Sequence, residues 1–145
     1  MLWKLLILIL LFNPSYGKDM RKKDTTVRTQ FHPMITEFLF EVNELYRGWK
    51  DEVVITSGSE VTASHSRNSL HYATPAQAVD IRSWSYAWGR GSVPKAHEQL
   101  NAICTLRDSF AERVQIPADW LEVHLETNHI HIEYQPKRQY AITGK

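Results

Sequence analysis

The chain has 145 residues, 43% of them hydrophobic, and its 17 basic and 16 acidic residues give a formal net charge of +1. This length is typical of one domain with a modest hydrophobic core. A charge balance so close to zero argues against a protein that binds nucleic acid through a basic face.

The N-terminus has the pattern of a secretory signal peptide. Lys4 precedes an apolar run from Leu5 to Phe12, and small residues follow at Ser15 and Gly17. We expect cleavage after Gly17 and export to a periplasmic or extracellular space. Eight apolar residues are too few for a membrane span, which needs about 20, so no stable membrane insertion is expected after cleavage.

The chain divides into four expected segments. Residues 1–17 are the signal peptide, and residues 18–30 form a basic polar N-terminal segment exposed to solvent. Residues 31–136 form the folded domain, and residues 137–145 form a C-terminal tail. Cys104 is the only cysteine, so it cannot form an intramolecular disulfide, and its apolar surroundings predict a buried, inert thiol.

Apolar periodicity predicts two helices. From Ile35 to Trp49 the apolar residues recur every three or four positions, which predicts an amphipathic helix over residues 34–48, started by Pro33 and ended by Gly48. A second stripe predicts a helix over about residues 94–113, with Pro94 in its first turn.

Short β-branched and alternating runs predict the strands. They are Val53–Thr56, Ala78–Trp84, Leu121–Glu126 and His129–Tyr134. The fold class is therefore α+β, with two main helices packed on a small antiparallel sheet.

The last two strands predict a hairpin with two unlike faces. A two-residue loop would pair Glu126 with His129, His124 with His131, and Glu122 with Glu133, while the apolar residues alternate onto the other face. Thr127 is a poor residue for a tight primed turn, which leaves the register open. The separation of a histidine-rich face from an apolar face does not depend on the register.

Histidine and carboxylate side chains gather in two segments, SLHYATPAQAVDIR and EVHLETNHIHIEY. The first contains His71 and Asp80, and the second contains Glu126, His129 and His131. Imidazole and carboxylate are standard zinc donors, and a hydrolytic zinc site keeps its fourth position open for water. A carboxylate that is not a ligand can then move protons. These residues predict a zinc site.

The strings ITSG, HSRNSLHY, AVDIR and HIHIEY resemble the zinc D-Ala-D-Ala carboxypeptidase superfamily. That group includes the vancomycin-resistance peptidases, phage L-alanyl-D-glutamate endolysins and the hedgehog signalling domain. The resemblance covers roughly residues 31–136. It implies the fold of that group, with His71, Asp80 and a terminal histidine as zinc ligands and Glu126 as the general base.

The terminal ligand is either His131 or His129. Members with a His-x-His pair resemble this chain best, and there the second histidine binds the metal, which favours His131. His129 would then line the site as an oxyanion or substrate contact. Members with a Glu-x-x-His pattern would select His129 instead. His65 and Ser69, in the first histidine cluster, are expected to orient the loop or contact substrate.

The chain departs from the superfamily pattern in the spacing of its first ligands. His71 and Asp80 are nine residues apart instead of the usual seven, and Ala76 stands where glycine is expected. The extra pair lengthens the bend without necessarily displacing Asp80.

A second departure concerns the substrate's carboxylate. Many members carry an arginine just after the Ser-Gly of the first strand, whereas here Ser59-Glu60 follow Ser57-Gly58. Arg67 or Arg82 is expected to take the role. Arg82 is preferred because it follows Asp80 by two on the same predicted strand and so faces the same side.

The resemblance implies an exported zinc peptidase that hydrolyses peptidoglycan stem peptides, as a carboxypeptidase or as an L-Ala-D-Glu-type endopeptidase. The alternative is a noncatalytic binding module of the same fold that keeps zinc for stability. Glu126 separates the two, because a structural site closed by four protein ligands has no use for a free carboxylate.

Overall fold

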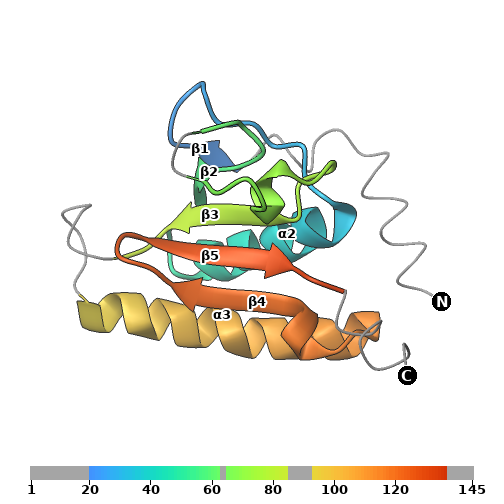
Figure 1. Ribbon diagram of the computed structural model, residues 1–145. Helices are drawn as coiled ribbons and strands as arrows, with labels where there is room; N and C mark the ends of the chain where they lie inside the picture. Colours follow the sequence, from blue (N-terminus) through green and yellow to red (C-terminus); the bar gives the residue numbers. More distant parts are fainter. Residues whose placement is uncertain (1–19, 63–64, 85–92, 137–145) are drawn as a thin grey trace.

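The computed structural model describes residues 20–62, 65–84 and 93–136 (Figure 1). The predicted signal peptide and C-terminal tail lie outside the described residues. Within the described ranges, none of the helices combines the length and the apolar character needed to cross a membrane.

The described chain forms a five-stranded mixed sheet in the order β1-β2-β3-β5-β4. The strands are β1 Arg21–Lys22, β2 Val54–Ser57, β3 Ala78–Arg82, β4 Leu121–Leu125 and β5 His129–Tyr134. The α+β class is confirmed. The expectation of an antiparallel sheet is wrong at one edge, where β1 runs parallel to β2, while the other three pairs are antiparallel.

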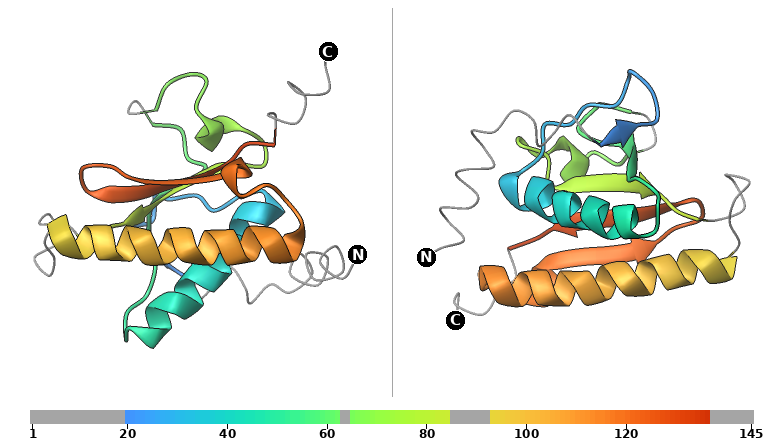
Figure 2. Two further views of the ribbon diagram at one scale, coloured as in Figure 1. Left: turned by 90° about the horizontal axis from the view of Figure 1, so that it is seen from below. Right: turned by 180° about the vertical axis from the view of Figure 1, so that it is seen from behind.

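Two long helices, α2 Pro33–Gly48 and α3 Val93–Val114, cover one face of the sheet (Figure 2). Their bounds agree with the predicted helices to within one residue. The ring of His32 accepts a hydrogen bond from Met34 N at the start of α2, and Pro33 occupies its first turn, where the missing N–H has no helical partner to lose.

The core lies between this helical layer and the sheet. Its fully buried side chains come from both helices and from alternate positions of the strands: Ile35, Phe38, Leu39, Val42, Ile103, Phe110, Ile55, Val79, Ile81, Ile130 and Ile132. Because strand side chains alternate, the residues between them project from the opposite face, which the two helices leave uncovered.

The segment that we expected to be a solvated N-terminal extension is partly built into the fold. Arg21 and Lys22 form the edge strand, and Met20 and Val27 are buried in the core. Two residues without a β-branched or alternating pattern give no strand signal, and parallel pairing with β2 fixes them instead.

The terminal hairpin has the expected register. Glu122 pairs with Glu133, His124 pairs with His131, and Glu126 N donates to the His129 carbonyl at 2.8 Å. Its histidine-rich face and its apolar face are therefore separated as predicted.

Candidate metal centre

Asp80 occupies the centre of the uncovered sheet face. Its neighbours in β3, Val79 and Ile81, are in the core, so alternation turns Asp80 to the other side. Its cross-strand neighbours are Ser57 of β2 and His131 of β5. Asp80 is only 6% exposed, which is unusual for a carboxylate without a cation beside it.

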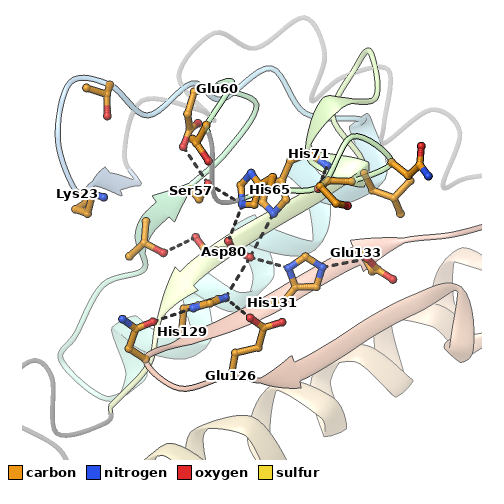
Figure 3. Close-up of a pocket in the computed structure, with 18 of the residues that line it drawn as sticks. Lys23, Ser57, Glu60, His65, His71, Asp80, Glu126, His129, His131 and Glu133 are labelled. Atoms are coloured by element: carbon orange, nitrogen blue, oxygen red, sulfur yellow. Dashed lines mark hydrogen bonds and ion pairs between the residues drawn. The ribbon is translucent and has the colours of Figure 1, made fainter.

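Four histidine rings surround the Asp80 carboxylate (Figure 3). From Asp80 Oδ1, His131 Nδ1 lies at 2.7 Å, His71 Nε2 at 3.4 Å and His129 Nε2 at 3.8 Å. His65 Nε2 lies 3.6 Å from Oδ2. One carboxylate and four imidazole nitrogens, brought together from three separate parts of the chain, form a donor set typical of zinc sites.

His71 is held so that one of its ring nitrogens faces Asp80. It lies in the short 3-10 turn Leu70–Tyr72, where Ser69 Oγ accepts a hydrogen bond from its backbone N–H. Its Nδ1 donates to the Gly58 carbonyl at 2.7 Å, which fixes the tautomer and leaves Nε2 directed at Asp80. That Nε2 is buried and has no hydrogen-bond partner among the described residues. A cation held beside Asp80 would give this buried nitrogen a partner.

Gly58 is required for this arrangement. A Cβ built on Gly58 would lie 1.8 Å from the backbone oxygen of Arg28, so no side chain fits there. The close approach of these two backbone segments holds the Gly58 carbonyl against the ring of His71.

His131 lies between two carboxylates. Its Nδ1 donates to Asp80 at 2.7 Å and its Nε2 to Glu133 at 3.0 Å. Burial lowers the pKa of His131, but these two hydrogen bonds outweigh burial and raise it to about 10. Without a cation the ring is therefore charged. A metal on Nδ1 would replace that proton while Glu133 keeps its hold on Nε2.

The nine-residue spacing does not displace Asp80. The bend between His71 and β3 is closed by Gln77 N, which donates to the Leu70 carbonyl at 2.9 Å. Asp80 Oδ1 consequently lies 3.4 Å from His71 Nε2.

Glu126 lies at the rim of the site. It follows β4 directly, its side chain is 51% exposed, and its Oε2 is 2.9 Å from His129 Nε2. A carboxylate that touches a histidine of the cluster and remains open to solvent can exchange protons with a substrate. His129 thus connects Glu126 to Asp80.

The cluster opens into a cavity of about 750 Å³, whose lining includes Ser69 and the site residues named above. The two predicted arginines do not line it. Arg67 is exposed, and Arg82 lines a second cavity of about 820 Å³ together with Arg21 and Asp51. Strand alternation puts Arg82 on the same sheet face as Asp80, as expected, but its side chain does not line the cavity at Asp80. Among the described residues, Lys23 is the only lysine or arginine that lines the first cavity.

Sequence reasoning missed the roles of three residues. His65 is a candidate donor and not merely a loop contact, since its donor atom, that of His71 and that of Asp80 all lie within 4.8 Å of one another. Glu133, placed from the sequence only opposite Glu122 in the hairpin, accepts a hydrogen bond from His131 Nε2. Lys23 comes from the segment taken as solvated tail. The only sequence signal for His65 as a metal donor is that it lies six residues before His71 in the segment HSRNSLHY.

No protein-family model, no curated protein and no solved structure matches this chain.

Proposed function

We propose that the protein is an exported zinc peptidase that hydrolyses peptidoglycan stem peptides, as a carboxypeptidase or an L-Ala-D-Glu-type endopeptidase. The observation that supports a zinc site is the convergence of four histidine nitrogens on the buried Asp80 carboxylate. The substrate class and export rest on the sequence resemblance and on the pattern of residues 1–17.

His71, Asp80 and His131 are the residues that would hold zinc. Held there, zinc would polarise a carbonyl and lower the pKa of a water molecule to about 7. Glu126 would take the proton from the attacking water and return it to the leaving amine, for which its position at the rim suits it. His129, in contact with Glu126, would orient this carboxylate.

Lys23 is the basic side chain best placed to meet a substrate carboxylate. It lines the cavity, whereas Arg67 and Arg82 do not. Glu60, which stands where the superfamily has an arginine, is already engaged, because its carboxylate accepts hydrogen bonds from the backbone N–H groups of Arg28 and Gly58. Glu60 therefore braces the loop and leaves substrate recognition to Lys23.

The second candidate function is a noncatalytic module stabilised by zinc. It is favoured by His65, which supplies a fourth protein donor, because structural zinc sites are closed by four protein ligands. Glu126 favours the peptidase, because a zinc site closed by four protein ligands binds no water for this carboxylate to deprotonate.

The deciding experiment is Glu126→Gln. We expect this variant to keep its zinc and its fold and to hydrolyse wall peptides about 10²–10⁴ times more slowly, the usual cost of losing a general acid–base group. Metal analysis and mass spectrometry of digested muropeptides measure the two properties. His97→Ala, an exposed change on α3, is the control.

The two candidate functions give different results. A zinc-loaded wild type that cleaves no wall peptide supports the binding module. Cleavage by Glu126→Gln at the wild-type rate assigns the base to another residue, with Glu133 to be tested next.

A further inference from the structure

We propose that His65 is a fourth, exchangeable zinc ligand that closes the metal site at rest and withdraws when substrate enters. This inference rests on the proposed function for the part played by substrate. The ligation itself rests on the contacts of His65 alone.

His65 faces Asp80 from the same direction as His71. Its ring lies parallel to that of His71, with centroids 3.9 Å apart and planes inclined by 9°. The two Nε2 atoms therefore face the same carboxylate, at 3.6 Å and 3.4 Å from the oxygens of Asp80. The side chain of His65 is 14% exposed, close to the 15% of His131, so it lies inside the site.

Zinc in proteins is usually tetrahedral, and three protein ligands leave one position to be filled. His71, Asp80 and His131 provide three donors. The nearest remaining donors are His65 and His129, and Nε2 of His129 already contacts the Glu126 carboxylate at 2.9 Å. His65 is therefore the histidine that would complete the coordination.

His65 is also the donor with the weakest support. The second nitrogen of His71 is held by the Gly58 carbonyl, and that of His131 is held by Glu133. Nδ1 of His65 is buried and has no hydrogen-bond partner among the described residues. Partners behind a ligand fix its orientation and raise its basicity, so His65 is the ligand most easily displaced.

A second partner for the displaced ring is already close. Ser57 Oγ lies 3.5 Å from His65 Nε2 and donates its own proton to Glu60 Oε1 at 3.0 Å. The released Nε2 would carry a lone pair and no proton, so it would accept a hydrogen bond from the Ser57 hydroxyl, which would turn away from Glu60 while Glu60 keeps its hydrogen bonds from Gly58 N. His65 can exchange zinc for the Ser57 hydroxyl through a small movement, which makes room for the substrate's carbonyl oxygen.

Ligation is tested by nuclear magnetic resonance of the full chain loaded with ¹¹³Cd²⁺ in place of zinc. We expect ¹H–¹¹³Cd correlations from the rings of His65, His71 and His131. Acetohydroxamate, which chelates metals through two oxygens, should abolish the His65 correlation and leave the other two. No correlation from His65 in the probe-free protein overturns the ligand assignment, and a correlation that persists with the probe bound overturns the exchange.

Two affinities give an independent measure. His65→Ala should weaken Zn²⁺ binding by about 10- to 100-fold, less than His71→Ala does, and should bind acetohydroxamate at least about tenfold more tightly than the wild type. His97→Ala should change neither affinity. Equal affinities in His65→Ala and the wild type contradict the proposal.

The outcomes separate this inference from the proposed function. A His65 correlation without hydrolysis of any wall peptide supports the ligand and removes the peptidase. Hydrolysis without a His65 correlation supports the peptidase and removes the ligand.

Discussion

Two acids among the described residues are almost fully buried, and their surroundings differ completely. Asp80 is 6% exposed and lies on the uncovered sheet face among four histidine nitrogens. Glu37 is 2% exposed and lies on α2, where neither of its carboxylate oxygens has a hydrogen-bond partner among the described residues.

The pKa values of the two carboxyl groups are consequently shifted in opposite directions. Burial raises the pKa of Glu37 to about 7, with a further rise from Glu41 that Arg113 only partly offsets. Burial also acts to raise the pKa of Asp80, but the hydrogen bond from His131 and the neighbouring rings of His71 and His129 outweigh burial and hold the pKa well below its usual value. Burial alone therefore does not mark a functional acid, whereas burial together with a set of converging donors does.

The largest expected effect breaks the site at Asp80. Asp80→Asn should weaken Zn²⁺ binding by more than the roughly 10- to 100-fold that loss of a partner behind a ligand costs, because it removes the anionic donor itself. His71→Ala should act in the same way. Competition with a chromophoric chelator measures the affinity.

Glu37→Gln is the matched control for this change, since it neutralises an equally buried acid outside the site and should leave zinc affinity unchanged. Full zinc occupancy in Asp80→Asn would refute the assignment of the metal centre.

The next effect concerns the support of His71. Gly58→Ala places a methyl group against the Arg28 carbonyl and should lower the free energy of unfolding by about 1–3 kcal/mol, as overpacking does, and weaken zinc binding as well. Gly48→Ala is the matched control, because a Cβ there meets no atom within 4 Å. Chemical denaturation of both variants checks the prediction, and equal stabilities would show that the Gly58 approach is not required.

Glu37 itself gives a pH-dependent effect. Its pKa is raised in the folded state, so folding favours its protonated form, and the wild type should lose stability as pH rises from about 4.5 to 7. Glu37→Gln lacks this titration. Between pH 4 and a pH above 7, the wild type should therefore lose up to about 3 kcal/mol more of its free energy of unfolding than Glu37→Gln does. Denaturation midpoints across this range measure the difference. Parallel pH profiles for the two proteins would mean that Glu37 does not titrate there.

The smallest effect is expected from Lys23. Lys23→Gln should raise KM about two- to fivefold for stem peptides with a free carboxylate and much less for amidated ones, since a half-exposed ion pair contributes up to about 1 kcal/mol. Arg82→Ala, which changes the other cavity, should affect both substrates alike. A selective loss in Arg82→Ala would restore that arginine to the carboxylate role.

The elements with strong local periodicity were predictable from the sequence. The two helices and the faces of the hairpin follow from spacings of 3.6 and 2, and these spacings also put Asp80 and His131 on one face. The parallel edge strand was not predictable, because Arg21 and Lys22 owe their conformation to a partner strand about 30 residues away.

The remaining site residues depend on placement that no local pattern encodes. His65 reaches Asp80 only because the loop after β2 stacks its ring on His71. Arg82 shows a related limit of sequence patterns. Alternation along a strand predicts the sheet face of a side chain, but the cavity that the side chain lines depends on the neighbouring elements.

The place of β5 in the sheet has a consequence for biosynthesis. This strand is the last of the described chain, yet it lies between β3 and β4. While the chain emerges from the ribosome, β3 therefore keeps an unpaired edge, and Asp80 waits for His131 until residues 129–134 have been made. A nascent chain that stops before β5 therefore lacks His131, and the donor set around Asp80 is complete only once this strand has been made.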